Sequence, residues 1–296
     1  MSFNVVCYGE ILWDIFPDYK VIGGAPLNVA FRLQSLGAET YMISRLGKDE
    51  NGKKALEYLK ETNLHTELIQ QDDRFPTGYV SVLLDEKGSA TYEIFKPVAW
   101  DFIALNEPNK KLISETDIFI FGSLACRNEV SRNSLLCLIR KATFSVFDVN
   151  LRKPHYTFDL ISKLMHEADF IKLNDEELDE IASELGFKSS NMKQQIQFIS
   201  ETTQTSTICV TRGSNGAMLY LDGNFYENLG YKVKVEDTVG AGDSFLASLI
   251  FKLYIQKEIP ENALDFACRV GALVASKNGA NVKIDTSEIS ALTIST

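Results

Sequence analysis

The sequence has few of the residues from which disulfides and zinc sites are built. Its 296 residues include five cysteines and three histidines. The cysteines lie far apart and mostly within apolar runs, so we interpret them as reduced core residues of a cytoplasmic protein. No group of cysteines and histidines has the spacing of a zinc site, which disfavours that class of metal chemistry.

The chain also lacks a long apolar run and an excess of positive charge. We therefore expect neither a signal peptide nor a membrane span. The net charge of −10 disfavours nucleic acid and anionic membranes as partners. It leaves an anionic small molecule open, because a few local donors can outweigh the overall charge.

Two phosphate-binding motifs are missing. No G-x-G-x-x-G follows the first expected strand, so a dinucleotide-binding Rossmann enzyme is disfavoured. Residues 47–54 resemble a Walker A loop, but Lys54 stands where a Ser or Thr should bind Mg²⁺, and Asp49 and Glu50 would repel phosphate. We interpret this segment as an ordinary acidic loop.

What the chain does contain is an alternation of strand and helix patterns. No linker or repeat divides it, so we expect a single α/β domain over residues 1–296 with a mostly parallel sheet covered on both faces. The expected strands are 5–13, 41–46, 117–121, 145–149, 170–173, 207–210 and 231–235, and the expected helices are 26–36, 52–61, 130–142, 176–185, 244–256 and 262–277.

Residues 65–97 break this alternation. They contain strand patterns without a helix between them and a hairpin-turn signal at 86–89, and residues 13–22 are also extended in character. We expect these two segments to form a small β unit that serves as a lid or as a dimer contact. The alternative is that they are edge strands of the main sheet.

The most informative segment is 236–245, Glu-Asp-Thr-Val-Gly-Ala-Gly-Asp-Ser-Phe. Small residues at Gly240, Ala241 and Gly242 let backbone N–H groups approach a ligand, and the start of the following helix favours phosphate. A carboxylate at Asp243 would repel that phosphate unless it takes part in the chemistry, which indicates a base that accepts a proton from an attacking hydroxyl. The alternative is that Asp243 is only a helix N-cap.

A second segment suits a polyhydroxylated ligand. Gly23 and Gly24 allow close approach of the backbone, and Asn28 in the first turn of a helix offers both a donor and an acceptor. Asp14 lies where the first strand pattern ends. Taken singly, Asp14 could be a surface carboxylate and Asn28 a helix cap.

With both segments in view, the chain resembles the ribokinase-like (PfkB) carbohydrate kinases. Residues 23–47 and 237–243 are similar to the two signatures of that family, with Ser248 where Gly or Ala is usual, and 174–177 and 211–216 are similar to two shorter motifs. The resemblance covers nearly the whole chain. It implies a ribokinase-like three-layer α/β fold with a small β lid, from about 13–22 and 65–97, that excludes water and could form a homodimer contact.

The resemblance also implies ATP-dependent phosphorylation of a sugar hydroxyl, with Asp243 as the base and Gly240, Ala241 and Gly242 as the anion hole. Asn174 and Glu177 would organise Mg²⁺, largely through water. The nucleotide would lie along Thr211, Arg212, Gly213, Gly216, Gly240 and Gly242, with Arg212 available to a phosphate, and the sugar would contact Asp14, Gly23, Gly24 and Asn28. A monovalent cation such as K⁺ would bind near Asp237, Val239 and Gly279.

For the sugar, the run Asp-Val-Asn-Leu-Arg-Lys-Pro at 148–154 looks most like fructokinases, which implies substrate contacts from Asn150 and Arg152 and fructose 6-phosphate as the product. Arg152 would equally suit the carboxylate of 2-keto-3-deoxygluconate. A nucleoside kinase of the same fold is a further alternative. A sugar or nucleotide sensor without activity is the third hypothesis, and the presence of Asp243, Asn174 and Glu177 argues against it.

Overall fold

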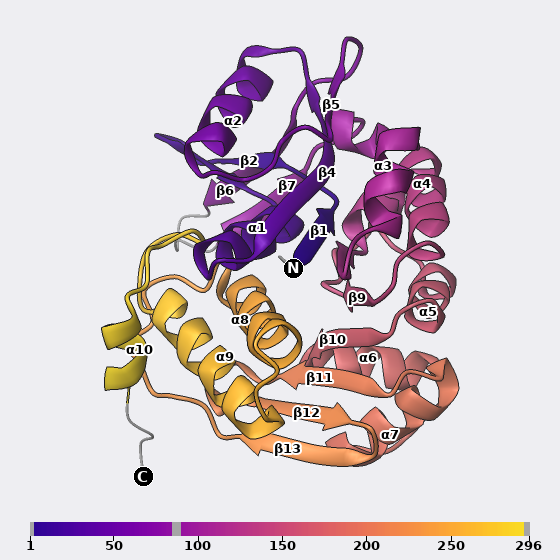
Figure 1. The fold of residues 1–296 in the computed structure, drawn as a ribbon, viewed down its shortest axis with the longest axis vertical. Helices are drawn as coiled ribbons and strands as arrows, with labels where there is room; N and C mark the ends of the chain where they lie inside the picture. The colour runs from indigo at the N-terminus through magenta and orange to yellow at the C-terminus, as the bar shows by residue number, and fades with distance from the viewer. Residues whose placement is uncertain (1–2, 85–89, 293–296) are drawn as a thin grey trace.

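The computed structural model describes residues 3–84 and 90–292. They form a fold built around a nine-stranded sheet (Figure 1). The strand order is β13-β12-β11-β10-β9-β8-β1-β4-β5, and only β12 and β13 at one edge pair antiparallel. The strands are β1 (Asn4–Tyr8), β4 (Glu39–Gly47), β5 (Ile69–Asp72), β8 (Ile118–Gly122), β9 (Ser145–Asp148), β10 (Phe170–Asn174), β11 (Thr207–Thr211), β12 (Ala217–Leu221) and β13 (Asn224–Asn228). The prediction of a mostly parallel sheet is confirmed.

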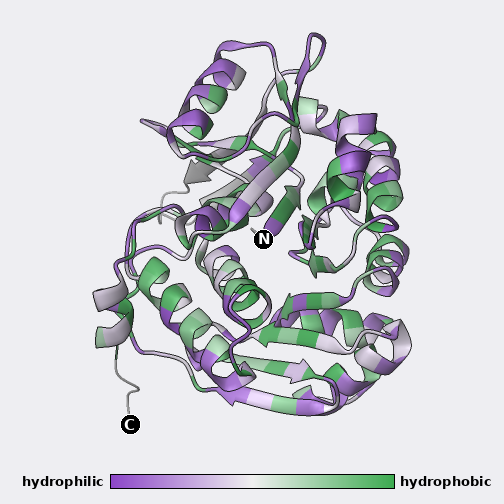
Figure 2. Cartoon of the chain, in the orientation of Figure 1, coloured by the Kyte–Doolittle hydropathy of each residue, from purple (hydrophilic) through white to green (hydrophobic). Residues whose placement is uncertain are grey.

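Helices cover both faces of this sheet because its inner strands are apolar on both sides (Figure 2). Along β1, Val5 and Cys7 belong to one core cluster, and Val6 and Tyr8 belong to the other. The first cluster includes α1 (Ala25–Ser35), α2 (Glu50–Glu61), α8 (Ala241–Ile250) and α9 (Pro260–Ala275); the second includes α3 (Glu107–Ser114), α4 (Glu129–Ile139), α5 (Phe158–His166), α6 (Asp175–Glu184) and α7 (Met192–Thr203). The short α10 (Thr286–Ala291) packs on α9.

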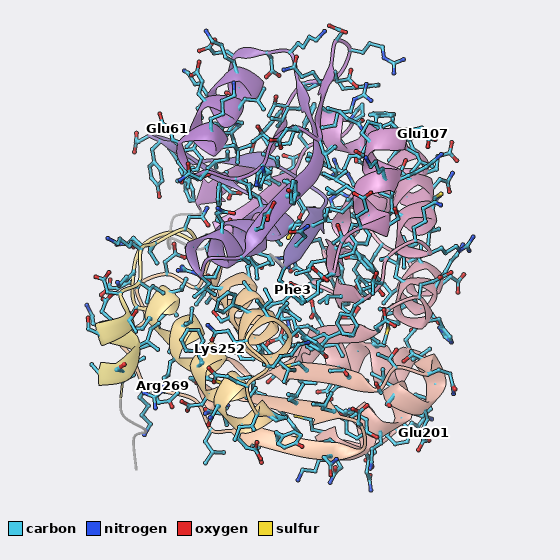
Figure 3. All side chains as sticks on the ribbon, viewed as in Figure 1. Phe3, Glu61, Glu107, Glu201, Lys252 and Arg269 are labelled. Atoms are coloured by element: carbon cyan, nitrogen blue, oxygen red, sulfur yellow. The ribbon has the colours of Figure 1, made fainter. Side chains whose placement is uncertain are left out.

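The polar faces of these helices point to solvent. Figure 3 shows Glu61, Glu107 and Glu201 at the margin of the molecule, on three different helices, and all three are exposed. This is the amphipathic pattern expected of helices that cover a sheet.

A second, four-stranded sheet has the order β3-β2-β6-β7. It is formed by β2 (Leu12–Ile15), β3 (Lys20–Gly23), β6 (Gly78–Leu84) and β7 (Ala90–Ile94). Its first two strands lie in the expected 13–22 region, but the expected 65–97 segment is too wide. Within it, β5 pairs with β4 in the main sheet, so this part follows the edge-strand alternative. The hairpin turn expected at 86–89 lies outside the described residues.

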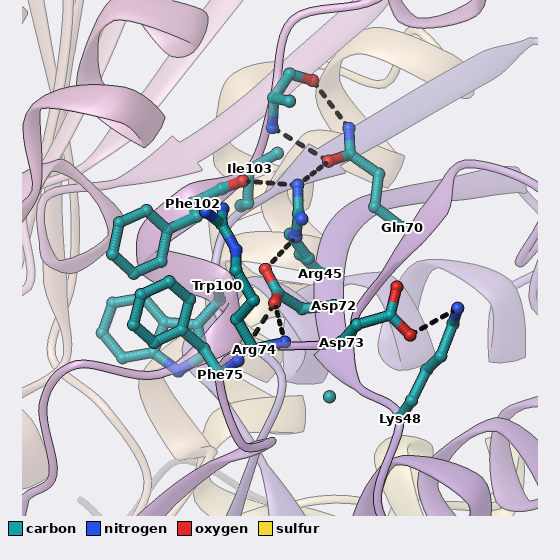
Figure 4. Close-up of polar contacts among 12 residues, drawn as sticks. Arg45, Lys48, Gln70, Asp72, Asp73, Arg74, Phe75, Trp100, Phe102 and Ile103 are labelled. Atoms are coloured by element: carbon teal, nitrogen blue, oxygen red, sulfur yellow. Dashed lines mark hydrogen bonds and ion pairs between the residues drawn. The ribbon is translucent and has the colours of Figure 1, made fainter.

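Polar contacts fix the end of β5, the edge strand of the main sheet, close to the point where the chain enters the second sheet (Figure 4). The Nε atom of Arg45 lies 2.7 Å from Asp72 Oδ2, and the other carboxylate oxygen of Asp72 accepts from the backbone N–H groups of Arg74 and Phe75. The Phe75 ring stacks on Phe102. The chain that leads to Gly78 and β6 is therefore anchored on the rigid main sheet.

Two expected strands are wrong. The expected strand 5–13 divides at Gly9, whose φ of 148° favours glycine, so that β1 enters the main sheet and β2 the small one. Residues 231–235 form no strand. Their alternating pattern reflects burial of Tyr231 beside exposed lysines, but the chain has already turned away from the sheet edge at Gly230, whose φ is 82°.

Candidate active site

The two informative sequence segments meet at the carboxyl ends of the main-sheet strands. Helices α1 and α8 pack against each other there, and Asn28 Nδ2 donates a hydrogen bond of 2.8 Å to Asp243 Oδ2. The other end of the Asn28 amide, Oδ1, accepts a hydrogen bond of 3.4 Å from Asn281 Nδ2. Ligands of open α/β sheets bind at this edge, so the position suits a catalytic site.

The glycine loop before α8 has a conformation that other residues would disturb. Gly240 is the N-cap of α8 with a φ of 74°, and a Cβ atom placed on it would lie 2.3 Å from the Cβ of Ala280. Helix α8 begins directly after it, at Ala241, and no side chain caps the helix. The Ala241 N–H donates to the Thr238 carbonyl at 3.2 Å. The N–H groups of Gly242 and Asp243 have no partner among the described residues, so they are open to an anionic ligand.

Asp243 lies in the first turn of α8 and is not its N-cap, so the capping interpretation is wrong. Burial, with the nearby Asp148 carboxylate, raises the pKa of Asp243 to about 6, although the Asn28 hydrogen bond and the cations Lys172 and Arg152 oppose that change. At neutral pH the carboxylate is therefore mostly ionised and still basic enough to accept a proton.

The expected sugar-binding residues surround the turn before α1. Gly24 has a φ of 117°, and a Cβ atom on it would lie 2.4 Å from the carbonyl oxygen of Glu10. Beside it, a Cβ atom on Gly23 would lie 2.7 Å from Asp14 Oδ2. Burial raises the pKa of Asp14 to about 6. The Asn28 capping interpretation is wrong as well, because Gly24 is the N-cap of α1.

Glu10 is a candidate that sequence reasoning missed. Its side chain is buried, and burial raises its pKa to about 7, opposed in part by Arg152. Its Oε2 atom has no hydrogen-bond partner among the described residues. The available signal was a carboxylate within the apolar pattern of the expected strand 5–13. Arg152 itself is exposed, and its charge lowers the pKa of both Asp14 and Asp243, so it lies within electrostatic reach of these two carboxylates.

Asn174 and Glu177 form a capping box at the start of α6. Asn174 Oδ1 accepts from the Glu177 N–H at 2.8 Å, and Glu177 Oε2 accepts from the Asn174 N–H at 2.9 Å. The other carboxylate oxygen of Glu177 accepts from the Leu151 N–H at 2.7 Å. Glu177 thus fixes the 148–154 segment, and any contact of this pair with Mg²⁺ would run through water, as expected for this ion.

The expected nucleotide-binding residues follow β11. Thr211 is the register partner of Asn174, and the loop that includes Gly213 and Gly216 packs closely against residues 228–230. Arg212, however, already has partners on the neighbouring hairpin. Its Nη1 atom lies 2.7 Å from Glu227 Oε1, and Nη2 donates to the Asn228 carbonyl, so its guanidinium group is used to hold β13.

The three residues expected at a monovalent cation are brought together. The carboxylate of Asp237 accepts from the Val239 N–H at 2.9 Å through Oδ1 and from the Gly279 N–H at 3.0 Å through Oδ2. Asp237 therefore links the loop before α8 to the turn at 279, next to the segment expected to form the anion hole.

The sequence that forms this site also matches a family profile. The profile described as pfkB family carbohydrate kinase matches residues 5–287. The chain belongs to the pfkB family of carbohydrate kinases. This confirms the predicted family and, with it, a phosphotransferase that acts on a sugar hydroxyl.

The relatives agree with this assignment. Fructokinase-2 of Oryza sativa subsp. japonica is 28% identical over 93% of this chain and 89% of its own length. Among solved structures, a sugar kinase from Pyrococcus horikoshii in complex with ATP is 27% identical with a TM-score of 0.81, and each chain is covered to 94%. A fructokinase from Vibrio cholerae O395 with fructose, ADP and calcium is 26% identical with a TM-score of 0.81, and each chain is covered to 95%.

In the part of the chain that the structure describes, no helix combines the length and the apolar character needed to cross a bilayer.

Proposed function

We propose that this protein transfers the γ-phosphoryl group of ATP to the 6-hydroxyl of fructose. The observation that carries the proposal is the Asn28–Asp243 hydrogen bond, which joins the hydroxyl-binding segment to the phosphate-binding loop. It puts a basic carboxylate at the point where a sugar hydroxyl and a phosphoryl group would meet.

The donor set fits ATP with Mg²⁺. The N–H groups of Gly242 and Asp243 in the first turn of α8 suit phosphate oxygens. Thr211 at the end of β11, and Gly213 and Gly216 after it, would contact the nucleotide. Bound ATP with Mg²⁺ supplies the phosphoryl group and offsets its charge. Asn174 and Glu177 would hold the hydrated Mg²⁺ ion, and Asp237, Val239 and Gly279 would bind a monovalent cation that stiffens the loop before α8.

Asp243 accepts the proton of the sugar hydroxyl. As the sugar oxygen bonds to phosphorus and the bond to ADP breaks, the hydroxyl proton passes to the Asp243 carboxylate. The N–H groups of Gly242 and its neighbours at the start of α8 stabilise the charge that develops on the phosphoryl oxygens. Asn28 holds Asp243 in place and contacts the sugar together with Asp14 and the backbone at Gly23 and Gly24.

Fructose is supported by the fructokinases among the relatives and by the 148–154 segment, in which the Leu151 N–H donates a hydrogen bond to Glu177. Asn150, with a φ of 41°, and Arg152 would make the contacts that distinguish sugars. No sugar or nucleotide sensor would need the base at Asp243, which disfavours that alternative.

The substrate is tested by ADP release with fructose, 2-keto-3-deoxygluconate, ribose and adenosine. Fructose is expected to give the highest kcat/KM. A tenfold or larger advantage for 2-keto-3-deoxygluconate, about 1.4 kcal/mol of transition-state binding, would make Arg152 a carboxylate-binding residue and overturn the substrate assignment.

We also propose that the protein is a cytoplasmic homodimer in which the small sheet forms the contact. Strand β3 is an edge of that sheet, and Tyr19, Val21 and Phe95 near its edges expose large apolar side chains. The five cysteines form no disulfide, which suits a reducing compartment. Light scattering is expected to give twice the chain mass of 33.2 kDa. A monomer mass at micromolar concentration would contradict the dimer.

A further inference from the structure

A buried ammonium group lies against the first turn of α8. Lys172 is on β10 and is only 7% exposed. Its Nζ atom donates a 3.0 Å hydrogen bond to Asp148 Oδ1, on the register partner in β9. Among residues 3–84 and 90–292 this is its only hydrogen bond, so two of its three N–H donors are unused.

The direction of the side chain is fixed by the glycine loop. A Cβ atom placed on Gly242 would lie 3.4 Å from Lys172 Nζ, so the ammonium group directly faces the loop that is expected to hold phosphate. Its charge also lowers the pKa of Asp243. The cation thus lies beside both the anion hole and the base.

The carboxylates of Asp148, Glu177 and Asp243 all act on the Lys172 ammonium group, so the cation also offsets their charge. The neighbours of Lys172 on its strand are apolar, and a buried ion pair often stabilises a protein no better than apolar residues of the same size. Asp148 moreover has one oxygen, Oδ2, without a hydrogen-bond partner in the described part of the chain. A buried lysine with unused donors, aimed at an open helix N-terminus, suits an anionic ligand.

We propose that Lys172 contacts the phosphoryl group during its transfer, beside the N–H groups at the start of α8. The inference rests on the proposed kinase reaction. In that step the bond from phosphorus to ADP breaks, the bond to the sugar oxygen forms, and the hydroxyl proton passes to Asp243, while Lys172 keeps its protons and offsets the charge of the phosphoryl oxygens. Because Arg212 is tied to Glu227, Lys172 takes the role that sequence reasoning gave to Arg212.

The test removes the ammonium group without leaving Asp148 buried and unpaired. Asp148→Asn is compared with the double variant Asp148→Asn/Lys172→Met. The control is Lys153→Met, which removes a charge from a lysine whose side chain is 72% exposed. Calorimetry with Mg²⁺ measures binding of ADP and of an ATP analogue with a β,γ-imido link. The double variant is expected to bind the analogue at least tenfold more weakly than Asp148→Asn, with ADP binding changed less than twofold and kcat lowered about 10²–10³-fold.

Equal losses for ADP and the analogue, or a kcat within threefold of Asp148→Asn, would overturn the proposal. If the double variant does not unfold cooperatively, Lys172→Gln, which keeps a donor for Asp148, is measured in the same way and must give the same selective loss. The binding arm needs no sugar. Failure of the wild type to phosphorylate fructose would therefore count against the proposed substrate and not against Lys172.

Discussion

Replacing Asp243 by Asn is expected to lower kcat by about 10²–10⁴-fold, the usual range for a positioned proton transfer. The amide keeps the size of the side chain but cannot accept the hydroxyl proton. Binding of ATP should persist or tighten, because a negative charge leaves the anion site. Steady-state kinetics and calorimetry on the same preparation measure both effects.

Asp159→Asn is the matched control, since Asp159 is also an acidic residue in the first turn of a helix but is exposed on α5. It should leave kcat unchanged. A near-wild-type kcat in Asp243→Asn would reduce Asp243 to a structural residue and remove the base from the mechanism.

Replacing Asn28 by Ala is expected to lower kcat/KM for fructose by about 10–100-fold. The variant loses the 2.8 Å hydrogen bond that holds Asp243 and leaves a sugar hydroxyl without its partner, and an unmatched buried polar group costs roughly 1–3 kcal/mol. The affinity for ADP, measured by calorimetry, should not change.

Ser35→Ala, at the exposed far end of the same helix, controls for general effects on α1. Unchanged fructose kinetics in a folded Asn28→Ala protein would contradict a role for Asn28 in sugar binding.

The fold was largely predictable because strand and helix periodicities are local. The alternation of apolar residues along β1 reflects its burial on both faces, and the glycine-rich segment before α8 has the small residues that its φ angles require. The strand expected at 231–235 failed because an alternating pattern reports burial and cannot show whether a neighbouring strand is present. The division of the first expected strand at Gly9 was missed for a similar reason. The pairing of β1 with β4 and of β2 with β6 depends on chain segments that are distant in the sequence.

The site was predictable where function depends on backbone shape and less so where it depends on side chains from separate strands. Asp243 and Asn28 lie in motifs from which their proposed roles could be predicted. Lys172 is a single charged residue within an apolar strand, and its position against Gly242 follows from the order of β10 and α8 in space. Arg212 looked free in sequence because its partner, Glu227, is on the next hairpin.

Product analysis is the decisive test of whether this site phosphorylates a sugar hydroxyl through Asp243. Fructose and ATP with Mg²⁺ are incubated with the wild type and with Asp243→Asn, and ³¹P NMR follows the phosphate esters. Fructose 6-phosphate is expected as the new ester with the wild type, and almost none of it with the variant in the same time. Inorganic phosphate without a sugar ester, or equal ester formation by both proteins, would contradict this mechanism.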